Sequence, residues 1–78
     1  MPDLGEPGVW PAIDIHLQDV IEIPRFSLHA RVTARHAEAG LVELRWDDAT
    51  PGSHAIGISA YQPDHPIRLR PAGTGRAA

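Results

Sequence analysis

Strict alternation of apolar and polar residues over 26–34, FSLHARVTA, is the feature that most constrains how this chain can fold. Successive side chains of a β-strand point to opposite faces, so a period of two predicts a strand with one buried and one solvent-facing side. The predicted inner face comprises Phe26, Leu28, Ala30, Val32 and Ala34, and the predicted outer face comprises Ser27, His29, Arg31, Thr33 and Arg35.

The same period continues on the C-terminal side of this segment. Residues 36–40, HAEAG, have the composition of a turn, and residues 41–46 alternate again. Pro51-Gly52 suits the two central positions of a type II turn, and it precedes a predicted strand at 54–60, HAIGISA. A short last strand, IRLR, covers 67–70. The residues predicted to point inward from these strands are Val42, Leu44, Trp46, Ile56, Ile58, Ile67 and Leu69.

Residues 13–23, IDIHLQDVIEI, fit two kinds of secondary structure. Apolar residues occupy most odd positions, and the β-branched Ile and Val residues favour a strand. A break at Gln18-Asp19 would divide this segment into two strands. A helix is the alternative, because Pro11 stands near a suitable helix start. The residues that would share one helical face are Ile13, Leu17, Val20 and Ile21.

The length of 78 residues allows one small domain, which we place at residues 12–70. Residues 1–11 contain three prolines and two glycines, a composition that predicts a flexible arm unable to form the hydrogen-bonded ladder of a β-sheet. Residues 71–78, PAGTGRAA, predict a disordered tail. The chain has no cysteine, so disulfides and thiolate metal sites are excluded. A small core without disulfides or a metal site is only marginally stable alone, which favours self-association or binding to a partner.

Five or six short antiparallel strands in so few residues predict an all-β fold that closes into a small barrel, since closure removes exposed strand edges. The order QDVIEIP…ARVTARHAEAGLVELRWDD resembles small SH3-like barrels. In those barrels a strand that starts at an Asp precedes a long bent strand, a Gly turn and a strand ending in an aromatic residue. The resemblance implies a binding module without a specified ligand. An OB-like barrel is the alternative.

Charge is distributed unevenly along the chain, whose net charge is −3. Residues 1–24 contain acidic residues and no Arg, whereas every basic residue of the remainder is Arg. The alternation predicts an outward basic stripe that would bind phosphate or an acidic partner, formed by His29, Arg31, Arg35, Arg45, Arg68 and Arg70. The negative net charge and the scarcity of exposed aromatic residues disfavour nucleic acid as that partner.

No constellation in the sequence predicts catalysis. Ser53 and His54 are adjacent, so on a strand their side chains would point to opposite faces. Asp47 and Asp48 follow a strand, where carboxylates usually accept hydrogen bonds from nearby backbone N–H groups. The GTG at 73–75 lacks the strand–helix context of a phosphate loop. We therefore expect a protein that is not an enzyme.

Metal, cofactor and membrane binding are likewise not expected. Asp14 and His16 are the one Asp–His pair that shares a strand face at close spacing, so the sequence predicts no metal site. No apolar run reaches 18 residues, and the N-terminus lacks the basic start and apolar core of a signal peptide. The expected location is the cytoplasm.

Four residues are candidate contacts with a partner: Trp10 in the arm, and Val20, Leu41 and Tyr61, which fall out of phase with the inner face. Trp46 is expected to close the core at a barrel end, or else to form a recognition platform at the rim. The sequence therefore predicts a non-catalytic protein-interaction module: an adaptor, an inhibitor or an assembly subunit, of the kind found among phage and accessory proteins. It would bind another protein or itself, as a homodimer or a larger assembly. The alternative is a nucleic-acid-associated or transcription-machinery regulator that uses the Arg stripe.

Overall fold

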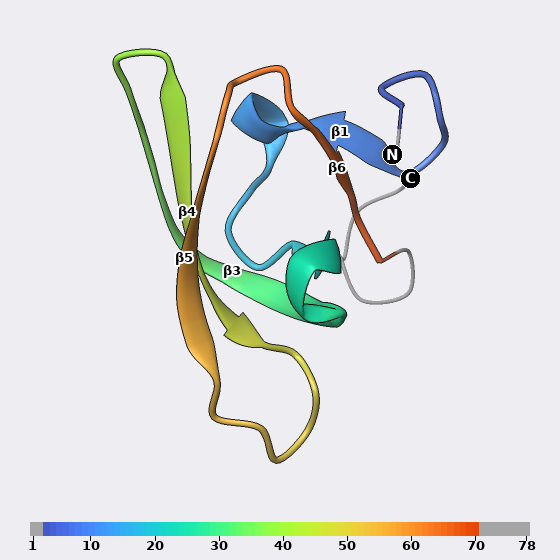
Figure 1. The fold of residues 1–78 in the computed structure, drawn as a ribbon, viewed down its shortest axis with the longest axis vertical. Helices are drawn as coiled ribbons and strands as arrows, with labels where there is room; N and C mark the ends of the chain where they lie inside the picture. The colour runs from blue at the N-terminus through green and yellow to red at the C-terminus, as the bar shows by residue number, and fades with distance from the viewer. Residues whose placement is uncertain (1–2, 71–78) are drawn as a thin grey trace.

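Six antiparallel strands form the framework of the computed structural model, which describes residues 3–70 (Figure 1). The strands are β1 (Val9–Pro11), β2 (Val20–Ile23), β3 (Leu28–Glu38), β4 (Leu41–Asp48), β5 (Ile56–Tyr61) and β6 (Pro66–Arg68). Two single-turn 3-10 helices, η1 (Ala12–Asp14) and η2 (Pro24–Phe26), complete the elements of this part of the chain. The predicted all-β antiparallel fold is confirmed.

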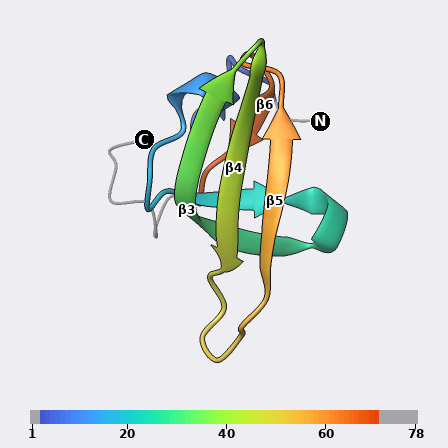
Figure 2. The same cartoon turned by 90° about the vertical axis from the view of Figure 1, so that its left-hand side faces the viewer.

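The strands form two sheets, of order β2-β3-β4-β5 and β1-β6. An isolated bridge between Ile21 and Leu69 joins the end of the smaller sheet to the edge of β2. No strand of the described chain pairs with the second edge of β5, so the predicted closure into a barrel is not observed. Figure 2 shows β3, β4 and β5 side by side, with β5 outermost.

The core lies between the two sheets. Its buried side chains are Ala12, Ile15, Ile21, Ile23, Ala30, Val32, Val42, Leu44, Trp46, Ile67 and Leu69. Trp10, Leu28 and Tyr61 pack against this cluster while staying partly exposed. The inward assignments for β4 and for the last strand are thus confirmed.

The long strand β3 departs from strict alternation at two places. Its register with β4 shifts between Val32 and Ala34, as in a β-bulge, so Ala34 lies opposite the exposed Arg45 instead of facing the core. The strand also begins only at Leu28, because Pro24 starts the turn of η2 and Ser27 takes a left-handed conformation with φ 53°. Phe26 therefore lies on η2 and is 55% exposed, which corrects its predicted place in the core.

Strand β5 faces the opposite way from the prediction. Ile56 and Ile58 are 80% and 54% exposed, and they lie opposite Asp47 and Arg45 on the outer face of the sheet. Gly57, the residue between them, takes the inward position, because Trp46 already occupies the interior there and an added Cβ would lie no more than 2.9 Å from three atoms of the indole. An isoleucine side chain has no room at that position.

Residues 13–23 form neither the long strand nor the helix that the sequence allowed. The chain makes the short turn of η1, then a turn through Gln18, whose φ is 73°, and only then enters β2. The carboxylate of Asp19, 2% exposed, accepts a hydrogen bond of 2.8 Å from the backbone N–H of His16 and closes this turn. Asp19 thus ends one segment and starts the next, as the predicted break required.

The N-terminal segment is not wholly a flexible arm. Val9–Pro11 forms β1 and pairs with β6, so the expectation that residues 1–11 hold no ladder is wrong for these three residues. A proline is tolerated there because β1 is an edge strand. Upstream, Glu6 forms a salt bridge of 2.7 Å with Arg68 of β6. The predicted tail, 71–78, lies outside the described residues.

Candidate interaction site along the free edge of β5

The predicted basic stripe does not form as one surface. His29, Arg31 and Arg45 lie on the outer face of the larger sheet, Arg68 lies in β6, and Arg70 follows it. The bulge places Arg35 on the same face as Leu44, where its side chain stays exposed and its guanidinium donates a hydrogen bond of 2.9 Å to the carbonyl of Ile13. This placement corrects the outward assignment of Arg35.

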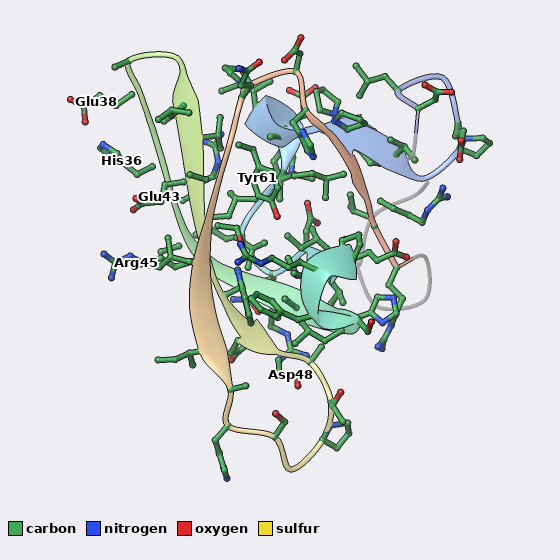
Figure 3. The ribbon with its side chains drawn as sticks, in the orientation of Figure 1. His36, Glu38, Glu43, Arg45, Asp48 and Tyr61 are labelled. Atoms are coloured by element: carbon green, nitrogen blue, oxygen red, sulfur yellow. The ribbon has the colours of Figure 1, made fainter. Side chains whose placement is uncertain are left out.

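The outer face carries charges of both signs. Arg31 lies directly opposite Asp47, and His29 lies opposite Glu22. His36 contacts Glu38 at 2.7 Å. Figure 3 shows the side chains of Arg45, Glu43, His36 and Glu38 along this same side. Neighbouring acids therefore offset the basic groups, and the face presents no uniform positive potential.

The four predicted partner contacts are also dispersed. Val20 is buried at 1% exposure, which overturns its assignment to the surface. The chain that follows β6 passes beside it, and the N–H of Arg70 donates a hydrogen bond of 2.8 Å to the carbonyl of Val20. Trp10 and Tyr61 are half-buried against the core, and Leu41, 51% exposed, lies at the β3–β4 turn.

Another group of apolar side chains does come together, along β5. Phe26, Ile56 and Ile58 are each more than half exposed. Phe26 and Ile58 line two adjoining depressions beside this strand, of about 340 and 360 Å³. We call the first depression the β5 groove; its lining residues are Ile23, Pro24, Arg25, Phe26, Ile58, Ser59, Ala60 and Tyr61. Figure 2 shows the teal turn of η2 next to β5.

Aromatic packing fixes this arrangement. The indole N–H of Trp46 donates a hydrogen bond of 3.0 Å to the Ser59 hydroxyl, which holds the ring beneath β5. The ring of Phe26 lies 6.3 Å from that of Trp46, centroid to centroid, at an interplanar angle of 48°. The guanidinium of Arg25 in turn lies 5.5 Å from the centroid of the Phe26 ring, within cation–π range.

The backbone of β5 leaves hydrogen-bonding groups free on the side away from β4. The N–H of Asp48 donates to the carbonyl of Ala55 at 2.8 Å, which sets the phase of the β4–β5 ladder. In an antiparallel ladder every second residue directs its N–H and C=O away from its neighbour, and here these residues are Ile56, Ile58 and Ala60. No other strand of residues 3–70 accepts or donates on that side.

Two polar groups border the β5 groove. Arg25 is the one charged residue that lines it, and its guanidinium forms no salt bridge within the described chain. Tyr61 lines the end of the groove, with its ring 5.1 Å from that of His65. Burial raises the pKa of the Tyr61 hydroxyl, so the phenol stays neutral at physiological pH. The groove is therefore apolar with one positive charge at its rim.

Residues singled out as weak catalytic candidates have structural roles or no partner. Asp48 accepts hydrogen bonds of 2.9 Å from the Thr50 N–H and from the Ser53 hydroxyl, and these bonds lower the pKa of its carboxyl. Asp47 Oδ1 is buried without a hydrogen-bond partner among the described residues.

Within residues 3–70 no group of three or more His, Asp or Glu side chains could hold a metal ion. No helix in this range has the length and apolarity to cross a bilayer.

Sequence patterning missed this site because it assigned Phe26, Ile56 and Ile58 to the core. The signal that could have revealed it is the pair of small residues Gly57 and Ser59, which lie across from the large Trp46 and Leu44 of the preceding strand. A comparison with protein-family models, curated proteins and solved structures finds no match to this chain.

Proposed function

We propose that this chain is a non-catalytic protein-interaction module whose contact surface is the free edge of β5. The observation that carries the proposal is the grouping of Phe26, Ile56 and Ile58, each more than half exposed, beside a strand edge without a partner. Contiguous exposed apolar surface of this kind marks interaction sites in soluble proteins. The roles of adaptor, inhibitor and assembly subunit all fit such a surface.

An SH3-like arrangement is part of this proposal. The bend of β3 at its bulge, the turn at Gly40 and the Trp near the end of β4 support it. The alternative function, a nucleic-acid-associated regulator, has less support, because the Arg side chains are dispersed and the outer face carries both signs of charge.

The test compares two surface variants that remove apolar side chains at different places. The double variant Ile56→Thr/Ile58→Thr changes the β5 edge, and Leu41→Thr is its matched control at the β3–β4 turn, where Leu41 is similarly exposed. Each protein captures partners from an extract of the native host, and a partner found with the parent chain is then purified and titrated by calorimetry. We expect the β5 variant to lose at least tenfold in affinity and the control to bind like the parent chain.

Equal affinity of all three proteins for the purified partner would overturn the proposal. Removing residues 1–11 is a poorer test, because Val9–Pro11 pairs with β6 and its loss would disturb the fold itself.

A further inference from the structure

We propose that the β5 groove binds an extended peptide segment, which adds to the sheet as a strand beside β5. The segment would carry an apolar residue at every second position and a carboxylate that meets Arg25. This inference rests on the proposed function and names the partner of the same site. Three observations support it, one each from the backbone, the groove and the charge.

The backbone of β5 presents the hydrogen-bonding groups that strand addition requires. Ile56, Ile58 and Ala60 direct their N–H and C=O away from β4 toward solvent. Natural proteins usually protect such an edge with a charge or a proline. β5 has the sequence IGISAY and contains neither, so its edge stays open to a further strand.

The groove lies where the side chains of an added strand would point. Alternate residues of that strand would face inward, toward Ile23, Pro24 and Phe26, which form the apolar wall of the groove. Ser59, a small inward residue of β5, lines this space without filling it. Its volume of about 340 Å³ falls within the range of roughly 300–1,000 Å³ that is usual for ligand pockets.

Charge selects the kind of peptide. Arg25 is held at the rim of the groove by its contact with the Phe26 ring, and it has no acidic partner in residues 3–70. A carboxylate on the bound segment would form a charge-assisted hydrogen bond with this guanidinium. A basic peptide would instead meet a like charge.

A second copy of this chain is a poorer occupant. An antiparallel β5 from another molecule would bring only Gly57 and Ser59 toward the groove at its centre, and it would leave the apolar wall uncovered. It would also bring no carboxylate to Arg25, because β5 contains no acidic residue. The groove therefore fits a foreign peptide better than its own copy.

The probes for the test are acetylated nine-residue peptides of alternating Thr and Val, each with one Val replaced by Glu in turn. Two controls accompany them: the same peptides with Lys in place of Glu, and the same peptides N-methylated at alternate residues, which removes N–H donors along one edge. Binding is followed by fluorescence anisotropy, and hydrogen exchange reports on the amides of Ile56, Ile58 and Ala60. Two protein variants, Ile58→Pro and Ile58→Ala, both shorten the exposed Ile58 side chain, but only Ile58→Pro removes the free N–H.

We expect one Glu peptide to bind and to slow amide exchange at Ile58 at least tenfold. Its affinity should fall at least tenfold further in Ile58→Pro than in Ile58→Ala, and Arg25→Glu should reverse the preference so that the Lys peptide binds better. N-methylation along the paired edge should abolish binding to the unaltered protein, a result that does not depend on how well Ile58→Pro folds.

Several outcomes would overturn the inference. Equal binding of all the N-methylated peptides would exclude strand addition, and so would unchanged amide exchange at Ile58. A chain that is dimeric in light scattering, and monomeric as Ile58→Pro, would assign the edge to a second copy. In each case a purified partner that still loses affinity with Ile56→Thr/Ile58→Thr would leave the proposed function standing, so the two failures are distinguishable.

Discussion

The indole of Trp46 lies against the backbone of Gly57 on the neighbouring strand, and this contact sets which face of β5 is exposed. An added Cβ on Gly57 would approach three ring atoms of Trp46 to 2.9 Å or less, closer than real side chains come. Large side chains on β5 therefore have to point outward, and Ile56 and Ile58 do so. One cross-strand contact thus produces the apolar edge on which the proposed site depends.

Replacing Gly57 tests this contact directly. We expect Gly57→Ala to lower the free energy of unfolding by about 1–3 kcal/mol, the usual cost of overpacking a well-filled core. The matched control is Gly5→Ala, since an added Cβ at Gly5 would have no atom within 4 Å. Urea denaturation followed by tryptophan fluorescence measures both variants, and an unchanged midpoint for Gly57→Ala would contradict the role of the contact.

The hydrogen bond from Trp46 to Ser59 should contribute separately. Ser59→Ala leaves the indole N–H of a Trp that is 5% exposed without its 3.0 Å partner, so we expect a loss of about 1–3 kcal/mol. A double-mutant cycle with Trp46→Phe isolates the bond, because Phe fills much of the same space without the donor. Strictly additive losses in the four urea curves would show that the bond contributes nothing.

The salt bridge between Glu6 and Arg68 should make part of the stability depend on pH. The hydrogen bond that the Arg68 guanidinium donates to Glu6 holds the pKa of the Glu6 carboxyl below its usual range. A carboxyl with a lowered folded-state pKa adds stability above its unfolded-state pKa, and that stability is lost as the pH falls through the folded-state value. Glu6→Gln should therefore lower the urea midpoint slightly at neutral pH, and the difference should vanish in acid well below the usual carboxyl pKa of roughly 4.

The control for this measurement is Asp64→Asn, which removes one exposed carboxylate elsewhere on the surface. A difference between Glu6→Gln and the parent chain that stayed constant from neutral pH into acid would argue against the salt bridge as its source.

A charge placed on the β5 edge should reduce association while leaving the fold intact. Ile58 is 54% exposed, so Ile58→Lys should change the free energy of unfolding by no more than about 0.5 kcal/mol. A lysine on an open strand edge opposes pairing with other strands, so the variant should aggregate more slowly at high concentration. Leu41→Lys is the matched control. Light scattering over time measures the aggregation rates of both variants. Equal rates would mean that the chain does not aggregate through the β5 edge.

Much of the fold could be anticipated from local patterning. The inward faces of β4 and of the last strand follow from the positions of Val42, Leu44 and Ile67, because an apolar residue at every second position can be buried only on one side of a strand. The β3–β4 turn at Ala39 and Gly40 lies within the predicted turn at 36–40, although residues 36–38 belong to β3. The break at Asp19 was also visible in the sequence, although the η1 turn before it was not.

The candidate site could not be anticipated in the same way. Period two gave the right spacing for β5, but the apolar residues were assigned to the wrong face. The bulge between Val32 and Ala34 changed the phase of the second half of β3 and placed Arg35 on the other face of the sheet from the predicted one. Val20 was covered by a distant part of the chain, next to Arg70.

The amino-acid sequence by itself determined that this protein is built from short antiparallel strands, because the alternation and the turn residues act on neighbours along the chain. Only the tertiary structure decided which apolar residues remain outside. That choice depends on which volume another strand already fills, and at β5 the ring of Trp46 fills it.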